Sequence, residues 1–220
     1  MRKVVWVAIC FFLAGCGASQ PVPDWFTAGH SQLEAYQKNY LSGDDKLAAL
    51  RFKGAINDIK KSGDLEMLAR AYLIRMALQR AVLEEPDAED YLKIAALQSM
   101  PTNRNYYAFL KGEPAQVDEK LLPAQYQGLL NNLRPEGEEG RLAAIGKMQN
   151  PLSQLIAMGV LVYRNQESEA LLQRAVAVAS AQGWKKALLA YLQRLKFYYE
   201  SKQQNDKALE IEQQVKLISN

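Results

Sequence analysis

From Ser31 to the C-terminus, apolar residues recur at helical spacing almost without interruption, so the chain must bury helices against helices. Ser31 followed by Glu34 is typical of a helix start at which the two residues cap each other. Further helices are expected at about 46–61, 65–85, 88–99, 103–111, 151–163, 167–182, 184–201 and 206–219. No segment convincingly predicts a strand. We therefore expect an all-α fold of about ten helices, arranged as stacked antiparallel hairpins.

The connections between these helices carry residues typical of helix ends. The Gly-Asp pairs at 43–44 and 63–64 each combine a glycine that ends one helix with an aspartate that caps the next. Asn150 followed by Pro151 is a capping residue with a first-turn proline. Such tight turns predict that successive helices are antiparallel neighbours.

Within the segment 46–61, Ala48, Phe52 and Ala55 place a large residue between two small ones. This spacing resembles the second helix of tetratricopeptide repeats, in which small residues let neighbouring helices approach closely. It recurs less clearly as Ala170, Arg174 and Ala177 and as Ala208, Glu212 and Val215. The family's closing proline is missing in all three places, and the middle of the chain departs from the pattern. The resemblance implies a degenerate tetratricopeptide-like array, while the spacing alone also fits an irregular helical domain.

The first fifteen residues have the organisation of an export signal. Arg2 and Lys3 precede an apolar run over 4–14, which is too short for a membrane span of about 20 residues and suits a secretory signal. The run ends in Leu13-Ala14-Gly15-Cys16, which resembles the lipobox of bacterial lipoproteins. The resemblance implies cleavage between Gly15 and Cys16 and a lipid on Cys16. Cleavage after Ala18 would instead discard this cysteine.

The lipobox also implies a location. Lipidated Cys16 would anchor the chain stably in a membrane, because two or more acyl chains suffice for durable binding. Residue 17 is Gly, not the Asp that retains such lipoproteins in the inner membrane of enteric bacteria, so the resemblance implies the periplasmic face of the outer membrane. Two prolines between Cys16 and Asp24 predict an extended tether.

We expect three segments: a signal peptide at 1–15, a lipidated tether at 16–28 and a helical domain at 29–220. A cluster of Gly, Pro and Glu predicts a weak boundary between two lobes near 135–140. At the foot of the domain, Trp25 and Phe26 are expected to pack against the first helices; contact with lipid headgroups is the alternative.

Composition excludes several classes of function. Without Arg2 and Lys3, the mature chain carries 25 basic and 24 acidic residues, which argues against nucleic acid as a partner. The single histidine, His30, leaves no basis for a histidine triad or a paired-histidine metal site. We therefore expect no cofactor, no metal and no enzymatic activity. Five carboxylates within 84–90 could attract a cation, but helix capping and first-turn charges explain them better.

Two surface features are candidates for binding. Aromatic residues cluster in the least regular part of the chain, at Tyr106, Tyr107, Phe109 and Tyr126. Basic pairs stand at 60–61 and 185–186. Together they could line a groove for an extended peptide, although such aromatics are more often core residues and such lysines a solvated face.

The absence of catalytic motifs and the repeat-like pattern favour a non-enzymatic scaffold that binds another envelope protein. One alternative is a peptidoglycan-associated accessory protein or enzyme, since Glu167-Ser168 and Glu200-Ser201 superficially match the start of a lytic transglycosylase motif. The residues that follow do not continue that motif. Another alternative is a lipid or glycan site between about 101 and 135, which would need a sizeable apolar cavity.

Overall fold

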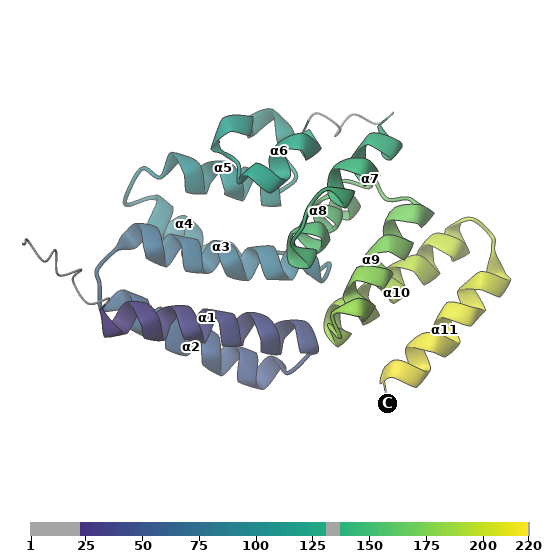
Figure 1. The fold of residues 1–220 in the computed structure, drawn as a ribbon, viewed down its shortest axis with the longest axis horizontal. Coiled ribbons are helices and arrows are strands. Elements are labelled where there is room, and N and C mark those ends of the chain that lie inside the picture. Colours follow the sequence, from purple (N-terminus) through teal and green to yellow (C-terminus); the bar gives the residue numbers. More distant parts are fainter. Residues whose placement is uncertain (1–22, 131–136, 220) are drawn as a thin grey trace, which may run out of the picture.

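The protein is all-α in the computed structural model, which describes residues 23–130 and 137–219. These residues form eleven α-helices and two short 3-10 helices, without a strand, which confirms the predicted fold class (Figure 1). The α-helices are α1 (Asp24–Ser42), α2 (Asp45–Lys60), α3 (Leu65–Ala81), α4 (Glu89–Ala95), α5 (Pro101–Leu110), α6 (Ala124–Leu130), α7 (Glu138–Gly146), α8 (Pro151–Tyr163), α9 (Glu169–Ala181), α10 (Lys185–Ser201) and α11 (Asn205–Ser219). None of them is long and apolar enough to cross a membrane.

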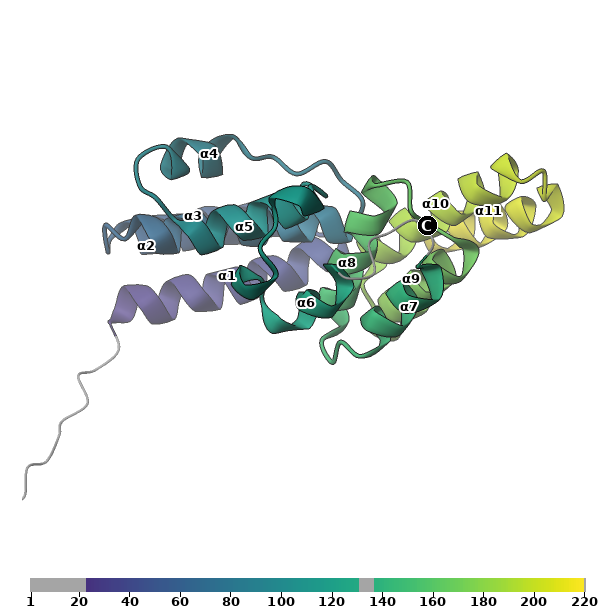
Figure 2. The same ribbon diagram turned by 90° about the horizontal axis from the view of Figure 1, so that it is seen from above.

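The helices form an elongated array. Helices α1 to α5 occupy one end of the molecule and α9 to α11 the other, with α8 between them (Figures 1 and 2). The antiparallel pair α1–α2 packs on α3, and α3 packs on α8. Helices α9, α10 and α11 follow as successive neighbours, and α10 also contacts α1.

The predicted helix ends are confirmed where the local signal is strong. Gly43 has a left-handed φ of 91°, and the Asp44 carboxylate accepts a hydrogen bond from the Leu47 amide at 3.1 Å. The side chain of Asp64 accepts from the Glu66 and Met67 amides, and that of Asn150 accepts from the Leu152 amide at 2.8 Å. These caps satisfy amides that the first turn of a helix leaves unpaired.

The predicted start of the first helix is wrong. Helix α1 begins at Asp24, seven residues before Ser31, and therefore includes the last residues assigned to the tether. Pro23 has a φ of −59°, its carbonyl accepts from the Phe26 amide at 3.0 Å, and Asp24 places negative charge in the first turn. The proline thus stands just before the helix, where its missing N–H costs nothing, and does not prevent helix formation.

Helix α3 ends earlier than predicted. It stops at Ala81, before the expected end near residue 85, because Leu83 adopts a left-handed conformation with φ 62°. The Glu84 amide then donates to the Gln79 carbonyl at 2.9 Å, which closes the helix in the manner of a C-terminal cap.

The repeat register is only partly retained. Ala48, Phe52 and Ala55 are buried between α1 and α3, as the resemblance implies. The second set is wrong, because Ala170 and Ala177 are exposed and α9 buries Leu171, Leu172, Ala175 and Ala179 instead. In the third set, only Ala208 is buried.

One hydrophobic cluster runs through the described residues from α1 to α11. It includes residues on both sides of the predicted lobe boundary, such as Leu129 in α6 and Ile145 in α7. Residues 131–136 lie outside the described part of the chain, so the boundary near 135–140 stays a prediction. The signal, Gly15, Cys16 and the first residues of the predicted tether also lie outside it.

Candidate partner-binding groove

A groove of about 380 Å³ opens where the first hairpin meets α3 and the start of α10. We call it the hairpin groove. It is lined by residues of α1, α2, α3 and α10 and of the segment after α3: Tyr36, Tyr40, Asp45, Ala48, Ala49, Phe52, Lys53, Arg75, Gln79, Glu84 and Lys186. A second hollow, lined by residues 42–46 and by Lys185, Lys186 and Leu189, shares Asp45 and Lys186 with it.

Aromatic rings form one wall of the hairpin groove. Tyr36 lies between Tyr40 and Phe52, with ring centroids 5.5 and 4.8 Å away, and Phe52 contacts Tyr72 edge-to-face at 5.6 Å. Because the rings come from three helices and are largely buried, their positions are fixed by the core. They form a rigid inner wall of the groove, although only 3 to 9% of each residue is exposed.

Charged residues at the mouth of the groove join distant parts of the chain. Lys186 of α10 forms ion pairs with Asp45 at 2.8 Å and with Glu84 at 2.9 Å, and its ammonium lies 4.0 Å from the centre of the Tyr40 ring. The Tyr40 hydroxyl donates to the second carboxylate oxygen of Glu84. One lysine therefore connects α10 with the first hairpin and with the segment after α3.

The pKa values of the groove reflect this network. Burial, and then the hydrogen bond to Glu84, raise the pKa of Tyr40 far above its usual value, so the phenol stays protonated as a donor. For Lys186, burial opposes the charged form, but the hydrogen bonds that its ammonium donates to Asp45 and Glu84 outweigh burial and raise the pKa. The ammonium is therefore charged at neutral pH.

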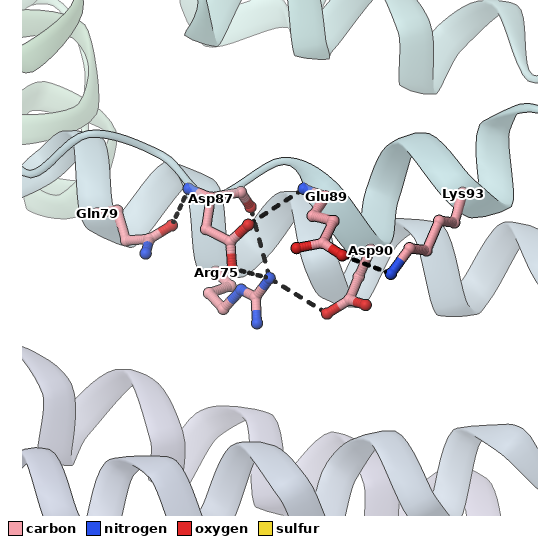
Figure 3. Close-up of polar contacts among 6 residues, drawn as sticks. All are labelled: Arg75, Gln79, Asp87, Glu89, Asp90 and Lys93. Atoms are coloured by element: carbon pink, nitrogen blue, oxygen red, sulfur yellow. Dashed lines mark hydrogen bonds and ion pairs between the residues drawn. The ribbon is translucent and has the colours of Figure 1, made fainter.

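Arg75 of α3 also lines the groove, and its side chain is 17% exposed. Its Nη2 donates to the carboxylate of Asp87 at 3.0 Å and to that of Asp90 at 3.5 Å (Figure 3). The buried Nε has no hydrogen-bond partner among the described residues. The guanidinium also lies 5.2 Å from the Phe52 ring centre and 5.0 Å from that of Tyr72. Two carboxylates and two aromatic rings therefore hold the guanidinium in place.

The acidic run after α3 is accounted for by contacts within the chain. Asp87 accepts from the Glu89 amide at 3.1 Å, as a residue that starts a helix does, and Glu89 pairs with Lys93 at 2.6 Å (Figure 3). Glu85 pairs with Lys111 at 3.3 Å. Across the described residues, no group of three or more His, Cys, Asp and Glu side chains could hold a metal ion.

The prediction of an exposed aromatic binding surface around residue 106 is wrong. Tyr106, Phe109 and Tyr126 do come together, with ring centroids 4.8 to 6.0 Å apart, but Phe109 and Tyr126 are only 1% and 2% exposed. Tyr107 stacks on the buried Tyr91 at 5.0 Å. Phe109 and Tyr126 therefore belong to the core, and the half-buried Tyr106 and Tyr107 pack against it.

The other residues that the sequence analysis weighed for a catalytic role each contact an oppositely charged or ionisable side chain. Glu167 receives two charge-assisted contacts from Arg194, at 2.7 and 2.8 Å, and Glu200 pairs with Lys196 at 3.6 Å. His30 is exposed on α1 and lies 3.3 Å from Glu34.

A larger hollow of about 710 Å³ lies between α6 and α7 and is lined mainly by small and polar residues such as Gln125, Gly128 and Ala144. The chain that connects these two helices lies outside the described residues. We therefore base no site on this hollow.

Sequence reasoning found parts of the hairpin groove without recognising it. Tyr36 and Tyr40 follow helical spacing on one face, and Lys186 belongs to a basic pair. Glu84 stood out only as part of the acidic run at 84–90, and Asp45 and Arg75 have no local signal, because only the fold brings these residues together. The chain matches no known protein-family model, no curated protein and no solved structure.

Proposed function

We propose that the chain is a lipid-anchored scaffold of the bacterial cell envelope that binds another envelope protein in the hairpin groove and performs no catalysis. The observation that carries this proposal is the composition of the groove. It combines a fixed aromatic wall with charged residues at its mouth and inner end, which is how protein surfaces that bind peptides obtain both affinity and orientation.

The bound segment would be a stretch of a partner protein that carries an apolar side chain next to an acceptor group. The apolar side chain would enter beside Tyr36, Ala49 and Phe52, and the acceptor would lie against the guanidinium of Arg75, whose side chain is 17% exposed. The lipobox motif at residues 13–16 supports the envelope location, since it resembles that of lipoproteins. The anchor at Cys16 would keep the groove near partners in the same membrane.

Site-specific photocross-linking in living cells tests this function. A benzoylphenylalanine at Lys53, which is exposed at the groove mouth, is expected to capture one defined envelope protein. The same probe at Gln213, which is exposed on α11, is the control and should capture none. Equal background labelling from both positions would contradict the proposal.

The anchor is tested separately in the same cells. Metabolic labelling with an alkyne fatty acid should mark the wild-type chain and not the Cys16→Ser variant. If both remain unlabelled, the lipoprotein assignment fails, whereas the groove could still bind its partner.

A further inference from the structure

The start of α1 carries two adjacent aromatic residues, of which Phe26 is exposed and Trp25 is half-buried. Trp25 and Phe26 contact each other edge-to-face with centroids 5.8 Å apart, and Phe26 is 42% exposed. Neither ring belongs to the hydrophobic cluster formed by the described residues, so the predicted packing against the first helices is wrong for Phe26, whereas Trp25 is half-buried. The reason is geometric: α1 packs on α2 from Gly29 onward, where a Cβ would lie 3.1 Å from Ile59.

The position of this pair along the chain limits what can cover it. Cys16 precedes Asp24 by eight residues, which reach at most about 28 Å at about 3.5 Å per residue. If Cys16 carries lipid, the start of α1 is therefore held close to the membrane surface. Tethering raises the effective concentration of the two partners, so even a small contact area can stay engaged.

The charges near the pair argue for an apolar contact. Lys60 and Lys61 lie at the end of α2, at the same end of the molecule as the start of α1 (Figure 1). Lys61 is ion-paired with Asp58 at 2.6 Å, and the first turns of α1 and α3 add the carboxylates of Asp24 and Glu66. This end therefore has no excess of positive charge with which to attract anionic lipids.

We propose that Trp25 and Phe26 dock the start of α1 into the headgroup region of the membrane that holds the lipid anchor. Aromatic rings favour this region, because one part of the side chain is apolar and the surroundings remain partly hydrated. Docking would fix the orientation of the molecule on the membrane. This inference rests on the proposed anchor. The lipid bilayer is what covers the two rings.

The mature chain is suited to a direct test. Cys10 belongs to the signal, so Cys16 is the only thiol of residues 16–220 and can be coupled to a maleimide lipid in phosphatidylcholine vesicles. Trp6 is also lost, and Trp184→Phe leaves Trp25 as the single fluorescent reporter. Because the coupling is chemical, the result does not depend on whether cells acylate Cys16.

We expect Trp25 emission to shift to shorter wavelength on coupling and to be quenched when the lipid chains carry bromine near the headgroups. The matched control is Trp25→Phe, in which Trp184 reports; this residue packs against the core at the start of α10 and should show neither change. Replacing Phe26 by Ser in the Trp184→Phe chain should reduce the quenching.

Two results would overturn the inference. In the first, Trp25 emission is the same in plain and brominated vesicles, and iodide in solution still quenches it. The other is quenching that requires phosphatidylglycerol and disappears at high salt, because that would assign the contact to the lysines. Circular dichroism of each variant verifies that the helices remain folded.

Discussion

At the scale of single residues, the tightest position among the described glycines is Gly159 of α8, which faces the backbone of α3. A Cβ built at Gly159 would lie 2.0 Å from the carbonyl oxygen of Arg80. The Arg80 side chain fixes the same junction, because its Nε donates to the Leu110 carbonyl at 3.1 Å and its guanidinium lies 3.9 Å from the Tyr163 ring centre. The centre of the array therefore depends on one glycine and one buried cation.

Gly159→Ala is expected to lower the free energy of unfolding by about 3 kcal/mol, since the clash involves backbone and the helices must separate. Gly128→Ala is the matched control, because no described residue lies within 4 Å of its Cβ position in α6. The free energy of unfolding of this control should rise by about 0.5–1 kcal/mol. Urea unfolding of both variants measures the difference; equal stabilities would show that α3 and α8 are not so closely packed.

At the scale of elements, residues with a local signal were predicted well from the sequence. The caps at Asp44, Asp64 and Asn150 depend only on neighbouring residues, so the pattern was sufficient. The start of α1 was missed because Pro23 reads equally well as part of a tether. The exposed positions of α9 were also misassigned, since tertiary packing decides which face of a helix is buried.

Glu169 joins the three C-terminal helices. Its carboxylate accepts from the Tyr199 hydroxyl at 2.9 Å and from Lys207 at 3.1 Å, and these hydrogen bonds lower its pKa from the ordinary value of 4.5. A lowered folded-state pKa contributes stability that is present above pH 4.5 and is lost as the pH falls through the folded-state value.

When the pH falls below about 4.5, the Glu169→Gln variant should therefore lose less free energy of unfolding than the wild type. Urea midpoints at neutral and acidic pH, measured for both chains, provide the comparison. Parallel curves for the two chains would mean that Glu169 does not couple the helices.

At the scale of the whole molecule, the hairpin groove could not be predicted. Its lining comes from segments between Tyr36 and Lys186, and the contact of α10 with the first hairpin brings these segments together. The aromatic residues that the sequence did suggest for binding form core instead, because composition alone does not distinguish an exposed ring from a buried one. The fold class was predictable, since it follows from the period of the apolar residues.

The most direct test of the account is the yield of the Lys53 cross-link when the groove is filled. Ala49 lines the groove and is exposed, so Ala49→Trp should block it without disturbing the core, whereas the adjacent Leu50 is 63% exposed and lies outside the lining. We expect Ala49→Trp to lower the cross-linked yield at least about tenfold, equivalent to about 1.4 kcal/mol of binding, and Leu50→Trp to leave it unchanged. Equal yields from the two variants would contradict the assignment of the groove as the partner-binding surface.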